Sequence, residues 1–315
     1  MSQANYDLDR SITAFFSSSR TSATREQCDG FARREFGGVV CPVPLQGMAS
    51  YTVTAGPNKV VQFREQSNSL DEKMPEAKAT ALATYSMDNL PGNNYVYIRS
   101  SLVESLPRQM ATVNSLARFF AQSWLSGRPT DLAQVSTTID ECAAVFRYLS
   151  DNLPSRFESS VAKVQGILPM LRSGEHPVVL THGDLNEMNI LVDPASGRIT
   201  GVVDWAEASF QPFGFALYAL DNALGSMGPD GWEYFDNADR LRDEFWSTFG
   251  TLVGGLSESR MEFIRLARAA GLLIRYGTPY DRGRFGGLVG VRDPSDVSLR
   301  YLDVLLSAEG ADSRK

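Results

Sequence analysis

The sequence predicts an α+β protein with two lobes: a small N-terminal lobe built on an antiparallel sheet, and a larger, mainly helical C-terminal lobe. Two patterns predict this. From residue 39 to 65, β-branched and aromatic runs alternate with turn residues. From about residue 104, apolar residues recur at steps of three and four, the spacing of amphipathic helices. With 315 residues, the chain is long enough to form two lobes with separate hydrophobic cores.

Composition limits the classes of function. Hydrophobic residues make up 43% and charged residues 21% of the chain, as in ordinary globular proteins. A net charge of −7 argues against nucleic acid or an anionic membrane surface as partner. Three scattered cysteines form neither a disulfide framework nor a zinc-binding pattern. No apolar run reaches the roughly 18 residues of a membrane span. We therefore expect a cytoplasmic protein.

The N-terminal lobe is predicted to comprise residues 1–98, beginning with two short helices. Three strands of an antiparallel meander are expected next, at residues 40–45, 50–54 and 59–64. The prolines of the first strand favour an edge position, because proline cannot donate a hydrogen bond to a neighbouring strand. A helix is expected to open within residues 69–79, and a last strand at 93–98. Residues 99–103 are then expected to form a hinge, followed by the C-terminal lobe, residues 104–315.

Alternation along the third strand assigns its side chains to two faces. Val61 and Phe63 share one face, and Gln62 and Arg64 share the other, because successive side chains of a strand point to opposite sides. The apolar pair is expected to cover the core of its own lobe. Arg64 is then expected on the face that points away from that core.

The C-terminal lobe contains a cluster of short strands between its helices. They are expected at residues 178–180, 189–192 and 199–203. The turn at residues 194–197 joins the last two as a hairpin. Asp184 and Asn189 therefore lie at the two ends of one loop, and the hairpin brings Asp204 back beside them. We expect all three side chains at the same edge of one small sheet.

This arrangement suits a particular chemistry. A carboxylate on an exposed loop, such as that of Asp184, can accept a proton from a substrate hydroxyl. Asn189 and Asp204 offer hard oxygen ligands, and Mg²⁺ binds few protein ligands together with phosphate oxygens. A base five positions before a metal-binding asparagine, with a metal-binding aspartate on the next hairpin, is the phosphoryl-transfer layout of protein-kinase-like enzymes. Because Asp184 fills the role of base, His182 is expected to brace the loop rather than carry protons.

These motifs resemble a known family. The sequence His182-Gly183-Asp184 with Asn189, followed by Val203-Asp204-Trp205, is similar to the aminoglycoside phosphotransferase and choline kinase-like family. The stretch from Ala206 to Gly214 resembles the fungal-type branch of that family. The resemblance implies a protein-kinase-like fold, with ATP and Mg²⁺ as cofactors. It also implies that Asp184 is catalytic and that Asn189 and Asp204 bind the metal.

The resemblance assigns further roles in the N-terminal lobe. Arg64 occupies the place of the lysine that normally holds the nucleotide phosphates, and its expected partner is Glu76. Glu72 and Asp71 are alternatives to Glu76. Ser50 and the turn before it correspond to the phosphate-covering loop, although a plain hairpin turn is an equal alternative on sequence alone. This turn carries a single glycine.

The sequence therefore predicts an ATP- and Mg²⁺-dependent phosphotransferase acting on a hydroxyl group of a small molecule. The acceptor is an amine, an amino sugar or a secondary metabolite. Two alternatives stay open. One is a kinase-like binding or scaffold protein without activity, which the arginine at position 64 and the glycine-poor turn favour. The other is an enzyme of this fold that carries out a different reaction on a metabolite.

Overall fold

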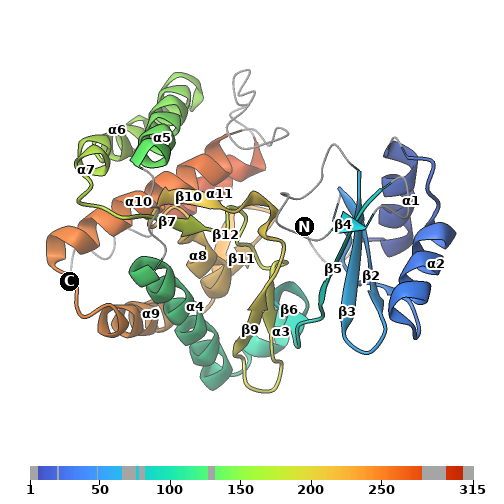
Figure 1. Cartoon of the computed structure of the whole chain (residues 1–315). Helices are drawn as coiled ribbons and strands as arrows, with labels where there is room; N and C mark the ends of the chain where they lie inside the picture. The colour runs from blue at the N-terminus through green and yellow to red at the C-terminus, as the bar shows by residue number, and fades with distance from the viewer. Residues whose placement is uncertain are drawn as a thin grey trace. The chain divides into compact units, whose positions relative to one another are not determined.

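The computed structural model describes residues 6–19, 21–47, 49–65, 76–77, 82–126, 132–278 and 296–307. The chain divides into two units, Met1–Pro91 and Gly92–Lys315 (Figure 1). The first contains an antiparallel sheet with helices, and the second is mainly helical with short strands. The predicted α+β fold class is confirmed.

The first unit places two helices on one side of its sheet (Figure 1). The helices are α1 (Leu8–Ser18) and α2 (Arg25–Phe36). The strands are β1 (Cys41–Pro42), β2 (Ser50–Ala55), β3 (Lys59–Arg64), β4 (Glu76–Ala77) and β5 (Ala83–Asp88). Their order in the sheet is β1-β2-β3-β5-β4, and every pairing is antiparallel. The proline-containing β1 is therefore an edge strand, as predicted.

The two faces of this sheet differ as the alternation predicted. Tyr51, Val61 and Phe63 are fully buried and pack with apolar residues of α1 and α2. Gln62 and Arg64 lie on the opposite face and are only partly buried. The core of the first unit therefore lies between the sheet and its two helices.

The prediction of a helix within residues 69–79 is wrong for the part of this stretch that the structure describes. Glu76 and Ala77 form β4, which pairs with β5 opposite Tyr85 and Thr84. The other residues of that stretch lie outside the described residues. Strand β5 was not predicted. Pairing with a neighbouring strand overrides local helix preference here, because a sheet edge offers hydrogen bonds that sequence pattern alone does not reveal.

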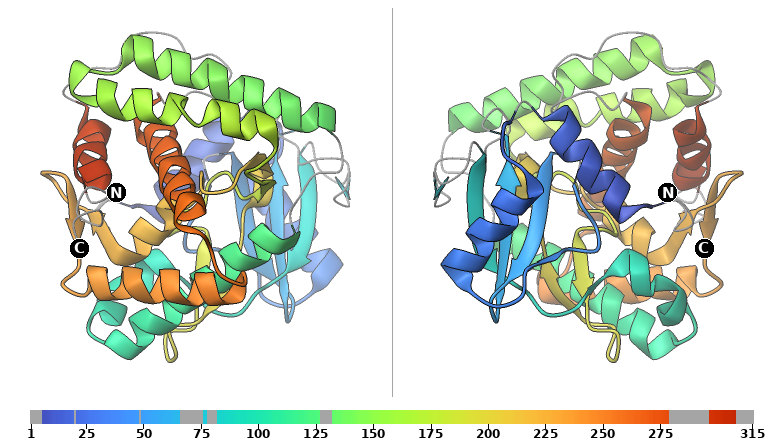
Figure 2. Two further views of the ribbon diagram at one scale, coloured as in Figure 1. Left: turned by 90° about the vertical axis from the view of Figure 1, so that its left-hand side faces the viewer. Right: turned by 90° about the vertical axis from the view of Figure 1, so that its right-hand side faces the viewer.

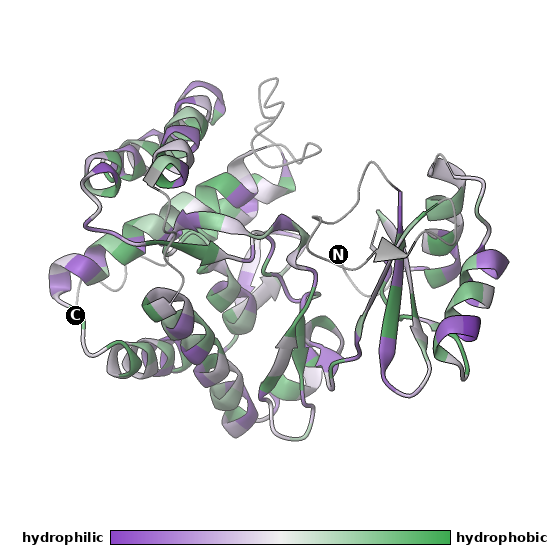
Figure 3. Cartoon of the chain, viewed as in Figure 1, coloured by the Kyte–Doolittle hydropathy of each residue, from purple (hydrophilic) through white to green (hydrophobic). Residues whose placement is uncertain are grey.

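The second unit is built from nine described helices of four residues or more. They are α3 (Tyr95–Val103), α4 (Leu106–Ser126), α5 (Leu132–Asn152), α6 (Glu158–Gln165), α7 (Leu168–Ser173), α8 (Tyr218–Leu224), α9 (Ala238–Leu252), α10 (Glu258–Gly277) and α11 (Val297–Ser307). Figure 2 shows α5 and α6 side by side. In Figure 3, hydrophobic and hydrophilic segments alternate along α4 and α10, as expected for helices with one buried face. None of the described helices combines the length and the apolar character needed to cross a membrane.

The strands of the second unit form three small sheets. Strand β7 (Val178–Thr181) pairs with β10 (Ser209–Pro212), whereas β8 (Ile190–Val192) pairs with β9 (Ile199–Val202) and β6 (Asn93–Asn94). Strands β11 (Gly225–Met227) and β12 (Trp232–Tyr234) form the third. The three predicted strands are confirmed, but the prediction of a single sheet is wrong. Because β10 returns alongside β7, the loop of residues 182–189 passes from one sheet to another.

Two predictions near the start of this unit are also wrong. The strand expected at residues 93–98 ends at Asn94, and α3 begins at the next residue. Tyr95, Ile98 and Leu102 follow helical spacing and are buried in the core of the second unit. Residues 99–103, predicted to be a hinge, belong to α3. The division between the two units falls after Pro91.

Candidate active site

His182 braces the loop that carries the predicted catalytic residue. Its Nε2 lies 2.8 Å from the carbonyl oxygen of Val203, and its Nδ1 accepts from the backbone N–H of Asp184 at 3.3 Å. A carbonyl can only accept, so Nε2 carries the hydrogen and the ring is neutral. Burial lowers the pKa of His182, which favours the same form. Both ring nitrogens are used in holding the loop, which agrees with the predicted bracing role.

Tyr218 of α8 fixes the backbone on either side of Asp184. Its hydroxyl donates to the carbonyl oxygen of Gly183 at 3.2 Å and accepts from the N–H of Leu185 at 3.0 Å. Gly183 has a φ of +85°, and a Cβ at this position would lie 2.2 Å from the carbonyl oxygen of Glu207. Only glycine fits this conformation and this close approach.

The carboxylate of Asp184 is paired with an arginine that the sequence did not reveal. Nη1 of Arg275, near the end of α10, donates to Oδ1 of Asp184 at 2.9 Å. Partial burial acts to raise the pKa of Asp184, but the charge and hydrogen bonds around it, those of Arg275 first, lower it overall. The side chain of Asp184 is 43% exposed. It is therefore an ionised carboxylate that a ligand can approach.

Asn189 is buried beside Asp184. Its Nδ2 donates to the backbone carbonyl of Asp184 at 2.8 Å and lies 3.5 Å from Oδ2 of the same residue. Because Nδ2 faces Asp184, Oδ1 is the amide atom available to a cation. The N–H of Val203 donates to the carbonyl of Asn189 at 2.9 Å. This bond continues the β8–β9 ladder and brings the next residue, Asp204, beside the loop.

Asp204 has an unusual backbone. Its φ is +61°, and it is the one non-glycine residue with positive φ in the described part of the chain. Aspartate tolerates the left-handed region better than most residues, but at a cost in energy. Its side chain is exposed, and both Asp204 and Asp184 act electrostatically on His182. The structure thus gathers Asp184, Asn189 and Asp204 around one loop.

The donor set suits magnesium with phosphate more than a metal held by protein alone. The candidate ligands are the carboxylate of Asp204 and the amide oxygen of Asn189. Within the described residues, no group of three or more His, Cys, Asp and Glu side chains could hold a metal ion. Mg²⁺ commonly takes one or two protein ligands and completes its octahedron with phosphate oxygens and water. The two side chains fit that use.

Ser50 and Arg64, two of the predicted residues of the first unit, lie on the polar face of its sheet. Ser50 and Arg64 are paired across β2 and β3. Gln62 joins them, because its Nε2 donates to Oγ of Ser50 at 3.2 Å and its Oε1 accepts from Nη1 of Arg64 at 3.2 Å. The side chain of Glu76 lies outside the described part of the chain, so its pairing with Arg64 stays a prediction.

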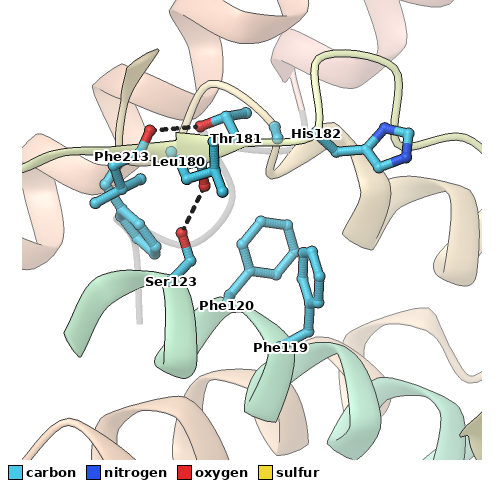
Figure 4. A pocket seen from close by; sticks show the side chains of 10 residues that line it. Phe119, Phe120, Ser123, Leu180, Thr181, His182 and Phe213 are labelled. Atoms are coloured by element: carbon cyan, nitrogen blue, oxygen red, sulfur yellow. Dashed lines mark hydrogen bonds between the residues drawn. The ribbon is translucent and has the colours of Figure 1, made fainter. Parts of the chain in front are cut away.

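Two cavities lie near β7 and β10. The first, about 10 Å³, lies between α4 and β7, where Ser123 donates to the carbonyl of Leu180 (Figure 4). It has room for one water molecule at most. The second, about 470 Å³, lies between α5 and β10 and is lined by residues including Thr137, Thr138, Glu141, Ser209 and Gln211. Because Ser209 pairs with Thr181, this cavity begins beside the residue that precedes His182.

Sequence reasoning missed Arg275 and Tyr218. Arg275 follows Asp184 by 91 residues, and no local pattern connects them. Tyr218 lies in an apolar stretch in which a tyrosine is indistinguishable from an ordinary core residue. Arg275 lies in the last turn of α10, where a basic residue is common for other reasons, so its position gives no specific signal.

Comparisons with known proteins bear on the family and the fold of the chain. The model of the phosphotransferase enzyme family matches residues 102–227, which include the whole loop and both hairpin strands. No curated protein matches the chain. The GDP complex of a mutant aminoglycoside 2′-phosphotransferase-IIIa is similar with a TM-score of 0.53 and 11% identity, over 98% of this chain and 99% of that one. A choline/ethanolamine kinase family protein from Mesorhizobium loti is similar with a TM-score of 0.50 and 14% identity, over 89% and 90%.

Identities this low establish the fold alone. The predicted resemblance to the fungal-type branch is tested by none of these matches and stays a prediction. The broader resemblance is confirmed: residues 102–227 match the phosphotransferase enzyme family, and the chain has the protein-kinase-like fold of aminoglycoside phosphotransferases and choline kinases.

Proposed function

We propose that this protein is a small-molecule phosphotransferase that uses ATP and Mg²⁺ to phosphorylate a hydroxyl group. The observation that carries the proposal is the grouping of Asp184, Asn189 and Asp204 around one braced loop. The match to the phosphotransferase enzyme family supports it. So does the structural similarity to a nucleotide complex of an aminoglycoside phosphotransferase. An ATP-dependent role of this kind is consistent with the predicted cytoplasmic location.

In this proposal, Asp184 orients the acceptor hydroxyl by accepting its hydrogen bond. A carboxylate with a lowered pKa is a weak proton acceptor, so orientation contributes more than early proton removal. This is sufficient for phosphoryl transfer, because its loose transition state needs little deprotonation of the nucleophile. Fixing the attacking oxygen in line with the phosphorus contributes most of what such a residue can supply.

Asn189 and Asp204 would hold Mg²⁺, which neutralises charge on the phosphates. Ser50 and Arg64 would bind phosphate oxygens, with Glu76 as the proposed partner of Arg64. Arginine presents a planar fork of donors where lysine presents a point charge, so the two bind phosphates with different geometry. All of these groups act by positioning and charge, without covalent chemistry.

We propose the cavity between α5 and β10 for the part of the acceptor that lies away from the reacting hydroxyl, because Asp184 is not among the residues that line it. Its volume of about 470 Å³ falls in the range of small-molecule sites. Hydroxyl and amide side chains line it, and Glu141 supplies a carboxylate that can pair with an amine. This agrees with an amine, an amino sugar or a hydroxyl-bearing secondary metabolite as acceptor.

A screen of ATP consumption tests the proposal. The panel contains amino alcohols, amino sugars and neutral polyhydroxy compounds, each assayed with Mg²⁺. Asp184→Asn is the matched control, because it preserves size while removing the charge. With the accepted substrate, we expect kcat of this variant to fall by about 10²- to 10⁴-fold. Transfer by Asp184→Asn at the wild-type rate would contradict the role of Asp184.

The scaffold alternative has a specific observation in its favour: arginine stands at position 64 where active relatives are expected to carry lysine. A thermal shift assay separates the two possibilities. A phosphotransferase should be stabilised by ATP with Mg²⁺, since a ligand at 100 times its Kd adds about 2.7 kcal/mol. No shift at millimolar nucleotide, together with no turnover in the screen, would favour the scaffold.

A further inference from the structure

We propose that Arg275 is a positioning residue for Asp184, holding its carboxylate so that Oδ2 is presented to the acceptor hydroxyl. The inference rests on the proposed phosphoryl transfer. Nη1 of Arg275 donates to Oδ1 at 2.9 Å, and Nδ2 of Asn189 lies 3.5 Å from Oδ2. A charge-assisted hydrogen bond of this length fixes one oxygen. Asn186 also donates a side-chain hydrogen bond to this carboxylate, and the contact of Asn189 at Oδ2 is longer than that of Arg275 at Oδ1, so Oδ2 is the oxygen that we assign to the substrate.

Arg275 is itself held by the residue that fixes the loop backbone. Its guanidinium carbon lies 4.4 Å from the centre of the Tyr218 ring, within the range of a cation–π contact. The hydroxyl of the same tyrosine bonds to Gly183 and Leu185, the neighbours of Asp184 in the chain. Tyr218 therefore fixes both the backbone around the carboxylate and the cation that binds it.

A buried ion pair sets the position of α10 against α8. Arg268 binds Asp221 with two hydrogen bonds, of 3.1 Å from Nε and 2.6 Å from Nη2, and both side chains are at most 8% exposed. Arg268 and Arg275 are seven residues apart, about two helical turns, so they share one face of α10. Tyr218 and Asp221 are about one turn apart on α8. Two arginines of α10 thus contact adjacent turns of α8.

These contacts give Arg275 a role beyond simple charge. Its planar guanidinium both stacks on Tyr218 and donates to Asp184, and a lysine ammonium offers charge without that fixed geometry. A displacement of about 1 Å at a reacting group can cost about 10² in rate. We therefore expect Arg275→Met to lower kcat about 100-fold while KM for ATP changes less than twofold. The kcat of Arg275→Lys should be about tenfold higher than that of Arg275→Met.

The kinetic experiment measures kcat and KM for ATP and for the acceptor identified in the screen. It compares the wild type with Arg275→Met, Arg275→Lys and the control Arg260→Met, an exposed arginine in the first turn of the same helix. The control should leave both constants unchanged. Wild-type kcat in Arg275→Met would overturn the inference, and so would equal losses in the Met and Lys variants, which indicate a structural role alone.

A second measurement does not depend on activity. Urea unfolding midpoints are compared for the wild type, Asp184→Asn, Arg275→Met and the double variant. If the pair is formed, the double variant loses less than the sum of the two single losses. Additive losses would overturn the inference. A wild-type protein that transfers no phosphate would contradict the proposed function, and the unfolding cycle would then decide whether Arg275 holds Asp184.

Discussion

Two residues in and near the loop that carries Asp184 adopt left-handed backbone conformations, and they do so for different reasons. Gly183 is required by its φ and by the carbonyl of Glu207 close to it. Asp204 also has a positive φ, although its side chain makes this backbone conformation unfavourable. Strained residues persist where the surrounding structure holds them, and they cluster at functional sites. The strain at Asp204 is therefore expected if its carboxylate is needed at that point.

Replacing Asp204 by glycine separates stability from function. Relief of the left-handed strain, about 1 kcal/mol, opposes the added entropy of glycine in the unfolded chain. We expect the free energy of unfolding to stay within about 1 kcal/mol of the wild type or to rise, while phosphate transfer is lost. Urea unfolding and the ATP assay measure the two effects. Asp204→Asn is the control for side-chain volume, and Mg²⁺-dependent transfer by Asp204→Gly would contradict the role in metal binding.

His176, the other histidine of the chain, should make stability depend on pH. It is buried, bonds to the carbonyl of Phe213 at 2.7 Å and packs 4.2 Å from the ring of Phe263. Burial lowers its pKa to about 4. The unfolded chain therefore binds a proton at higher pH than the folded one. The stability that neutral His176 gives to the folded protein is complete above about pH 6.5 and is lost as pH falls toward 4.

The expected loss from His176 is about 3 kcal/mol across that interval, from the difference between the two pKa values. Unfolding free energies of the wild type and His176→Asn, measured at pH 7 and pH 4.5, give this contribution as a difference. The free energies of unfolding of the wild type and of His176→Asn should lie closer together at pH 4.5 than at pH 7. Parallel curves for the two proteins would mean that His176 is not held in the neutral form.

At the scale of elements, the contact between α8 and α10 depends on the buried pair of Arg268 and Asp221. Arg268→Met leaves the carboxylate of Asp221, 2% exposed, without its cation. Breaking a buried ion pair from one side typically costs about 3–5 kcal/mol. We expect a loss of this size in urea unfolding. Replacing both charges removes the unpaired carboxylate, so the double variant Arg268→Met with Asp221→Leu should recover most of the lost stability. If Arg268→Met alone were as stable as the wild type, this account of the helix contact would be refuted.

The elements that sequence predicted well are those whose pattern matches their final environment. The alternation of Val61 and Phe63 with polar residues identified β3, because one face of that strand is buried and the other is not. The stretch from Tyr95 to Ile98 misled the prediction, since aromatic and β-branched residues favour strands. This stretch forms a helix because its residues are buried at helical spacing in the core of the second unit. That core is assembled from distant parts of the chain.

In the candidate site, too, some residues could be predicted from local sequence and others could not. Asp184, Asn189 and Asp204 were found because they lie within about 20 residues and their order in the chain has chemical meaning. Arg275 was not found, because it reaches Asp184 only through the packing of α10 on α8. Contacts that depend on how helices pack leave no local signal. The loop could be predicted from sequence, and the cation that holds it could not.

At the scale of the whole molecule, the loop, its braces and its arginine all belong to Gly92–Lys315, which has its own core. The proposed phosphate-binding residues Ser50 and Arg64 belong to Met1–Pro91. This division allows a binding experiment to treat the two sets of residues separately. Substitutions in the first unit should weaken nucleotide binding with or without metal, whereas substitutions at Asn189 and Asp204 should remove only the part that depends on Mg²⁺.

Calorimetric titration of ATP into the protein, with and without Mg²⁺, tests the central claim most directly because it needs no acceptor. We predict that Mg²⁺ strengthens ATP binding by the wild type about tenfold or more, equivalent to about 1.4 kcal/mol. The combined substitution Asn189→Leu and Asp204→Ala should abolish that difference while leaving metal-free binding unchanged. Equal affinities with and without Mg²⁺ in the wild type, or an undiminished effect of Mg²⁺ in the variant, would contradict the assignment of this loop as a phosphoryl-transfer site.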